Sequence, residues 1–215
     1  MRAKSFQSNL LEINMWQKIS AIGKKVVSSG LVEANFGNIS VRSGENSFVI
    51  TKTKTALDEI QKESLIEMPI ANDSVTNEDR DLLKILEKTA SSETKIHRRI
   101  YSETTAKAIL HAHCPYSVVM SLLEYENGNA SIIPIDSEGK LFLKNIPIVT
   151  GGIGSDELAE NAASALKKEG VKGIIIFGHG TIAVGDSLEE AYHITAQLEH
   201  SAKIKYMYAK AKNLF

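Results

Sequence analysis

The sequence has one cysteine, four prolines and few aromatic residues in 215 positions. Cys114 alone cannot form an intrachain disulfide, and a zinc site built from several thiolates is excluded as well. No apolar run approaches the length that spans a bilayer, and the amino-terminal segment has no unbroken apolar stretch typical of a signal peptide. We therefore expect a cytoplasmic protein in which any metal site uses histidine and carboxylate ligands.

Charge of neither sign is in excess, because 25 lysines and arginines stand against 26 acidic residues and the two signs are interspersed. This balance gives no electrostatic support for a nucleic acid or a membrane surface as a partner. The chain also lacks repeats, low-complexity tracts and linkers. Because 215 residues are enough to bury one substantial core, we expect residues 1–215 to form a single α/β domain.

Hydrophobic spacing and turn residues predict the secondary structure. The predicted strands cover 39–41 and 48–50, as a hairpin, and 64–70, 107–111, 131–135, 146–149, 172–177 and 181–185, and residues 71–79 are polar and turn-rich. The first three predicted helices lie at about 11–26, ended by Gly30, around Leu82, Leu83 and Leu86, and from near 91 with Ser92 as the cap. The last three run from Pro115 to 124, from Ser155 to Gly170, and onward from Asp186, which forms a capping-box-like start with Glu189.

Two histidines flank Ala112 where a predicted strand ends. Side chains alternate along a strand, so His111 and His113 project from one side, about 6 to 7 Å apart, and their imidazoles can converge on one cation. A polar strand edge would give the same pattern. His179 lies between two glycines directly after another apolar strand, where close backbone approach is permitted, although Gly-His-Gly is equally a plain turn. Three imidazoles with a free coordination position are typical of catalytic zinc sites.

An acidic residue follows two serines at a predicted helix start. The free N–H groups there and the hydroxyls of Ser91 and Ser92 suit an anion such as phosphate, while Glu93 is equally explained by favourable helix electrostatics. His97 lies one turn after Glu93 and could face it. The sequence has no P-loop and no dinucleotide fingerprint, so no nucleotide cofactor is expected.

Five ordered segments, ANFGNIS, ASSETKIHRRIY, ILHAHCPYSV, FGHGTIAVGDSLEEAY and LEHSAKI, together resemble the class II aldolase/adducin family. The resemblance runs from about Trp16 to about Tyr206. It implies a three-layer α/β/α fold around a mainly antiparallel sheet, assembled as a homotetramer with active sites between subunits. It also implies Zn²⁺, or another divalent metal, bound by His111, His113 and His179.

The family pattern further implies site roles and a reaction. Glu93 corresponds to the catalytic base, and the residues that correspond to phosphate ligands are Asn38, Thr53, Ser91 and Ser92. The implied reaction is reversible retro-aldol cleavage of a ketose 1-phosphate, similar to L-fuculose 1-phosphate, into dihydroxyacetone phosphate and an aldehyde. Glutamate rather than aspartate at position 93 favours this reaction over sugar-phosphate 4-epimerisation.

Two other functions remain as alternatives, one enzymatic and one not. A dehydratase acting on methylthioribulose 1-phosphate would keep the same three histidines. An adducin-like interaction module without catalytic activity would lack them, so their presence favours an enzyme.

The sequence departs from the family pattern in the loop that commonly reads Thr-Pro-Thr-Gly. Here Lys52 replaces the proline and Lys54 replaces the glycine, so a lysine could supply a point charge to the phosphate or could block the pocket. Ala90 replaces the usual proline before the serines. The tyrosine that related aldolases take from a neighbouring subunit as a general acid is missing, and the acid is unassigned among Tyr125, Asp136 and Glu138.

Overall fold

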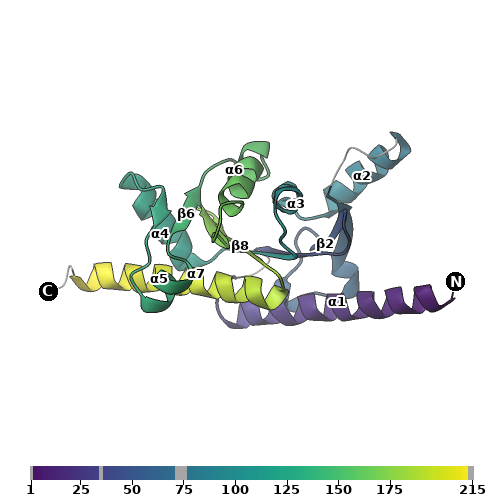
Figure 1. Cartoon of the computed structure of the whole chain (residues 1–215), viewed down its shortest axis with the longest axis horizontal. Helices are drawn as coiled ribbons and strands as arrows, with labels where there is room; N and C mark the ends of the chain where they lie inside the picture. Colours follow the sequence, from purple (N-terminus) through teal and green to yellow (C-terminus); the bar gives the residue numbers. More distant parts are fainter. Residues whose placement is uncertain (1, 34–35, 71–76, 213–215) are drawn as a thin grey trace.

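An eight-stranded sheet forms the centre of the structure (Figure 1). The computed structural model describes residues 2–33, 36–70 and 77–212, and the side chains of these residues except 2–14 and 77–82. The strand order is β3-β2-β1-β4-β8-β7-β6-β5. The strands are β1 Asn38–Arg42, β2 Ser47–Thr51, β3 Leu65–Pro69, β4 Ala108–Ala112, β5 Ser131–Ile132, β6 Ile146–Val149, β7 Gly173–Ile176 and β8 Gly180–Gly185.

The sheet is mainly antiparallel, as the family resemblance implies. Only β6 and β7 run parallel, and every other neighbouring pair is antiparallel. In the register between β1 and β4, Asn38 is the partner of His111. In the register between β4 and β8, Ala112 is the partner of Thr181. These pairings bring segments from three distant parts of the sequence to one place.

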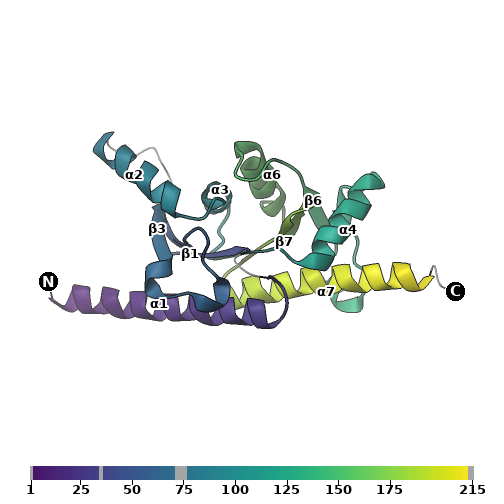
Figure 2. The same cartoon turned by 180° about the vertical axis from the view of Figure 1, so that it is seen from behind.

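Helices cover both faces of the sheet, which confirms the predicted three-layer α/β/α fold. Helices α3 (Thr94–Glu103) and α6 (Asp156–Leu166) lie on one face, and α1 (Arg2–Ser28) and α7 (Leu188–Lys212) lie on the other (Figures 1 and 2). Strand β4 contributes apolar side chains to both layers. Ile109 packs in the apolar cluster of α3 and α6, whereas Leu110 packs in the cluster of α1 and α7. Successive side chains of one strand point to opposite layers.

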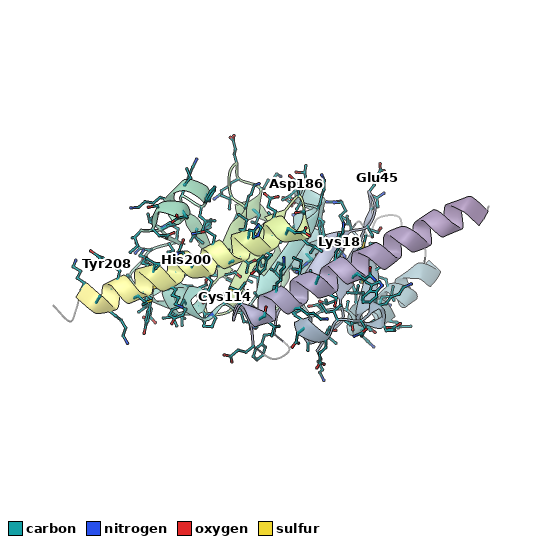
Figure 3. All side chains as sticks on the ribbon, turned by 90° about the horizontal axis from the view of Figure 1, so that it is seen from below. Lys18, Glu45, Cys114, Asp186, His200 and Tyr208 are labelled. Carbon is teal, nitrogen blue, oxygen red and sulfur yellow. The ribbon has the colours of Figure 1, made fainter. Side chains whose placement is uncertain are left out.

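The two long helices lie side by side across one face of the sheet (Figure 3), where Ser29 Oγ and Tyr192 Oη are 2.9 Å apart. Helices α4 (Pro115–Glu126) and α5 (Ser137–Phe142) pack near the second half of α7, around an apolar cluster that includes Met120 and Leu198. The remaining helical elements are α2 Asn77–Thr89, η1 Leu57–Glu59 and η2 Lys62–Ser64. Within the described ranges, no helix is long and apolar enough to cross a bilayer.

Several sequence predictions of helix ends are confirmed. Pro115 occupies the first turn of α4, the Ser155 hydroxyl accepts a hydrogen bond from Leu158 N at the start of α6, and Gly30 follows α1 with a φ of 69°. The predicted cap of α3 is wrong. The N-cap residue is Glu93 rather than Ser92, because Ser91 Oγ accepts the N–H of Glu93 and the helix starts one residue later.

Other boundaries also differ from the sequence prediction. Strand β5 ends at Ile132 instead of 135, and the short helix α5, which we did not predict, follows because Asp136 accepts the N–H of Gly139. At the start of α7, Ser187 Oγ accepts the N–H of Glu190 and Glu190 Oε2 accepts the N–H of Asp186, so Glu190 rather than the predicted Glu189 makes the side-chain contact. Of the turn-rich segment 71–79, residues 71–76 lie outside the described residues and the remaining three open α2.

Candidate metal centre

Three imidazoles meet at the edge of the sheet where β4 ends. His111 is on β4, His113 directly follows it, and His179 lies in the tight turn between β7 and β8. The ring centroids are 4.8 Å apart for His111 and His113, 4.9 Å for His111 and His179, and 4.5 Å for His113 and His179. One nitrogen from each ring lies within 4.8 Å of the other two, so the three side chains could hold a metal ion.

Close backbone approach around β4 explains two of the nearby glycines. A Cβ at Gly180 would lie 2.5 Å from the carbonyl oxygen of Ala112, and a Cβ at Gly37 would lie 2.5 Å from that of His111. Both distances are far below van der Waals contact, so no larger residue fits at either position. These glycines let the turn that carries His179 and the start of β1, which carries Asn38, lie directly against β4.

Glu93 reaches this centre from the start of α3 and is 4 % exposed. Its Oε2 accepts a hydrogen bond of 2.8 Å from Asn38 Nδ2 and lies 3.0 Å from His111 Nε2. Its Oε1 lies 3.6 Å from His179 Nδ1 and has no hydrogen-bond partner. The carboxylate therefore stands beside the imidazoles with one oxygen free.

The hydrogen bonds of His111 fix which nitrogen carries its proton. His111 Nδ1 lies 2.9 Å from the carbonyl oxygen of Thr181, which can only accept, so Nδ1 is the N–H and the neutral ring presents a lone pair at Nε2. That lone pair faces the carboxylate of Glu93, another acceptor. Two buried acceptors 3.0 Å apart are stable only with a cation or a proton between or beside them. The donor set therefore fits a divalent metal that prefers imidazole.

Burial sets the ionisation of these groups. Desolvation lowers the pKa of His111 to about 4, and desolvation together with the other two histidines lowers the pKa of His113 to about 4. Burial also lowers the pKa of His179. All three rings are therefore neutral at pH 7, which is the form that binds metals. Burial raises the pKa of the Glu93 carboxyl, against the opposing effects of His179 and Asn38.

A cavity of about 360 Å³ opens beside the histidines. The predicted phosphate ligands Asn38, Thr53, Ser91 and Ser92 all line it, together with Glu93 and the three histidines. Ser91 is buried, and Thr53 and Ser92 are exposed. Lys52 and Lys54 line the same cavity and leave it open.

Two apolar side chains of the cavity were missed by the sequence reasoning. The ring of Phe36 stacks on that of His113 with centroids 5.0 Å apart, although Phe36 is 51 % exposed. Ile153 lines the cavity from the loop after β6 and is also exposed. Single apolar residues in loops have no periodicity, so nothing in the sequence marked them.

The other candidate residues lie outside this cavity. His97 is fully buried behind it, where its Nδ1 lies 2.6 Å from Ser40 Oγ, and burial lowers its pKa to about 3. Asp136 caps α5, and the ring of Tyr125 packs against that of Phe177 at an interplanar angle of 46°. Neither of these two residues lines the cavity, nor does Glu138. The described part of the chain therefore supplies no general acid from these three candidates.

Comparison with known proteins identifies the family to which the chain belongs. Residues 17–206 match the family model of the class II aldolase and adducin N-terminal domain. The chain belongs to the class II aldolase and adducin family. The L-fuculose phosphate aldolase of Methanococcus maripaludis is 30 % identical over 186 residues, which cover 86 % of this chain and 88 % of that protein.

This class II aldolase family member is also similar to two further proteins whose names refer to sugar phosphates. The methylthioribulose-1-phosphate dehydratase of Persephonella marina is 29 % identical over 189 residues, or 83 % of each chain. The crystal structure of L-fuculose-1-phosphate aldolase from Thermus thermophilus matches with a TM-score of 0.78 and 28 % identity, covering 92 % of this chain and 95 % of that chain. Class II aldolases are metal-dependent, and among the described residues the three histidines form a group that could hold a metal ion.

Proposed function

We propose that this chain is a metal-dependent lyase that cleaves a ketose 1-phosphate, similar to L-fuculose 1-phosphate, into dihydroxyacetone phosphate and an aldehyde. The observation that carries the proposal is the placement of a buried carboxylate, Glu93, beside three neutral imidazoles at an open cavity. The similarity to two L-fuculose phosphate aldolases supports the choice of reaction.

His111, His113 and His179 would hold the metal, which we propose to be zinc. When bound, a divalent ion supplies electrostatic stabilisation for the negative charge that develops as a carbon–carbon bond breaks. Two contacts orient the imidazoles: His111 Nδ1 donates to the carbonyl oxygen of Thr181, and the ring of Phe36 stacks on that of His113. These contacts hold the imidazole rings in place before any ligand arrives.

Glu93 would act as the proton carrier. A general base needs a pKa near the working pH, and burial moves the pKa of this carboxyl upward from its ordinary value. The hydrogen bond from Asn38 to Oε2 fixes the orientation of the carboxylate, and Oε1 remains free to accept a substrate proton. In the condensation direction Glu93 would remove a proton from the hydroxymethyl carbon of dihydroxyacetone phosphate, and in the cleavage direction it would return a proton to that carbon.

The phosphate would be held by Ser91, Ser92 and Thr53, with the second N–H of Asn38 beside them. All four line one cavity with Glu93. An anion there fixes the reacting end of the substrate relative to the carboxylate, which contributes to rate through orientation.

We also propose a cytoplasmic homotetramer of single-domain chains with active sites between subunits. The support is the missing general acid, since none of Tyr125, Asp136 and Glu138 lines the cavity. An acid from a neighbouring copy would complete the site.

A second candidate function is dehydration of methylthioribulose 1-phosphate. The 29 % identity to the Persephonella marina dehydratase favours it almost as strongly as the aldolase similarity favours cleavage. Both reactions use a ketose 1-phosphate and need a proton transfer at a carbon of the sugar, which a carboxylate can carry out.

A panel of ketose 1-phosphates incubated with the zinc-loaded protein separates the two reactions. We expect release of dihydroxyacetone phosphate, measured by coupled reduction with glycerol-3-phosphate dehydrogenase. Loss of water without carbon–carbon cleavage would replace the aldolase assignment with the dehydratase, and inversion at C4 would replace it with the epimerase.

A further inference from the structure

Lys54 has an unusual backbone conformation at the mouth of the cavity. Its φ is 62°, in the left-handed region where the Cβ of any residue other than glycine crowds the backbone. Among the described residues other than glycine, only Lys144 shares a positive φ, at 57°. A strained residue persists only where the surrounding structure holds it, and such residues gather at functional sites. Lys54 lines the candidate site, so its conformation raises the question of what the side chain does there.

Hydrogen bonds within the loop restrict how it can bind an anion. The N–H of Lys52 donates to Ser64 O at 2.8 Å, that of Thr53 to Thr89 O at 3.0 Å, and that of Thr55 to Lys52 O at 3.3 Å. These three amides are committed to the fold. The N–H of Lys54 has no acceptor in the described part of the chain, so this one amide and the side chains of the loop are the donors that remain for an anion.

The side chains that the loop offers are cationic. Lys52 and Lys54 both line the cavity, and within the described part of the chain neither forms an ion pair. Among the described residues that line the cavity, Glu93 is the only acidic one, and its Oε2 already accepts from Asn38. Two unpaired ammonium groups beside the hydroxyls of Ser91 and Ser92 attract a group that carries more than one negative charge.

We propose that Lys54, with Lys52 beside it, is a specificity-determining residue that selects substrates whose pocket-facing end is a dianionic phosphate ester. This inference rests on the proposed function and deepens it. In the family pattern a glycine lets the backbone approach the phosphate, whereas here an ammonium group replaces that contact. A lysine ammonium is a point charge without the fixed fork of an arginine, so it selects charge rather than shape.

The binding test compares two ketones that differ only in the phosphate. Dissociation constants of dihydroxyacetone phosphate and dihydroxyacetone are measured by titration calorimetry with zinc-loaded wild type, Lys54→Gly, Lys54→Ala and Lys54→Arg proteins. Loss of one charged hydrogen bond predicts that Kd for the phosphate ester rises about tenfold in the Gly and Ala variants. We expect Lys54→Arg to stay close to wild type, and Kd for dihydroxyacetone to be unchanged in all variants.

The strained backbone of Lys54 predicts a second effect of its replacement by glycine: thermal stability should rise while phosphate binding falls. Lys54→Gly relieves the left-handed conformation and should raise Tm by roughly 2–4 °C, while Lys54→Ala keeps the strain and should not. Lys144→Gly is the matched control, because Lys144 is strained in the same way but does not line the cavity. It should raise Tm by the same amount and leave both dissociation constants unchanged.

Unchanged binding of dihydroxyacetone phosphate in both Lys54→Gly and Lys54→Ala would overturn the inference, whatever happens to Tm. If the wild type does not bind this ketone, inorganic phosphate takes its place in the same comparison. The proposed reaction can fail separately: a tenfold loss of anion binding in an enzyme that cleaves no ketose phosphate would refute the aldolase assignment and support the role of Lys54.

Discussion

Replacing Glu93 by glutamine should lower activity and raise the stability of the metal-free protein. Glutamine has nearly the same shape, so the change removes the negative charge and the ability to accept a proton. Loss of a general base reduces kcat by about 10²- to 10⁴-fold, which corresponds to roughly 3–5 kcal/mol of activation free energy. The effect on stability has the opposite sign because of the contacts around Glu93.

In the metal-free protein the Glu93 carboxylate faces acceptor lone pairs, with Oε2 3.0 Å from His111 Nε2 and Oε1 3.6 Å from His179 Nδ1. The amide of glutamine places an N–H toward one imidazole while its oxygen still accepts from Asn38. Removal of one buried unsatisfied contact is worth about 1 kcal/mol, so Tm should rise by roughly 2–4 °C for a chain of this size.

The assay is thermal unfolding in the presence of a chelator, with steady-state kinetics of the zinc-loaded enzyme measured in parallel. Glu126→Gln, which changes an exposed glutamate at the end of α4, is the control and should alter neither quantity. A glutamine variant that keeps wild-type kcat, or that is less stable than wild type without metal, would refute this account of Glu93.

Two other predictions follow from burial and packing. Gly180→Ala places a Cβ 2.5 Å from Ala112 O, so we expect a loss of about 1–3 kcal/mol in the free energy of unfolding, measured in urea, and weaker zinc binding because the turn of His179 must move. Burial depresses the pKa of His97 to about 3, below the unfolded value of about 6.5, so the unfolded chain binds the extra proton and stability falls as pH drops through this window. Between pH 7 and pH 4 this contribution to the free energy of unfolding is about 3 kcal/mol. His97→Asn should therefore flatten the pH dependence of the free energy of unfolding measured in urea, whereas His193→Asn, at an exposed position, should leave it unchanged. The same pH dependence in His97→Asn and wild type would contradict this account of His97.

Local chemistry explains which parts of the fold could be predicted from the sequence. Pro115, Ser155 and Gly30 act through their own backbone or hydroxyl groups, so the helix ends that they mark were predicted correctly. The helix α5 was missed because its six residues are too few for periodicity, and its cap Asp136 is also held by Gln197, distant in the sequence.

Some features of the site could also be predicted from the sequence, and others could not. Strand alternation places His111 and His113 together from the sequence alone, but their meeting with His179 depends on the pairing of β4 with β8. The proton position on His111 depends on the carbonyl of Thr181, and the orientation of Glu93 depends on Asn38. Spacing rules hold no information on such distant partners. The residues alone suggested that three imidazoles could form a zinc site, and the family resemblance added Glu93 and Asn38 to it.

The central claim is that the three histidines form one metal site. Elemental analysis of the purified protein tests it directly. We predict about one divalent ion per wild-type chain, and a marked loss of metal in His111→Ala, His113→Ala and His179→Ala, each with an unchanged circular dichroism spectrum. A folded wild-type protein that binds no divalent ion, or a His179→Ala variant that keeps its full metal content, would contradict the account.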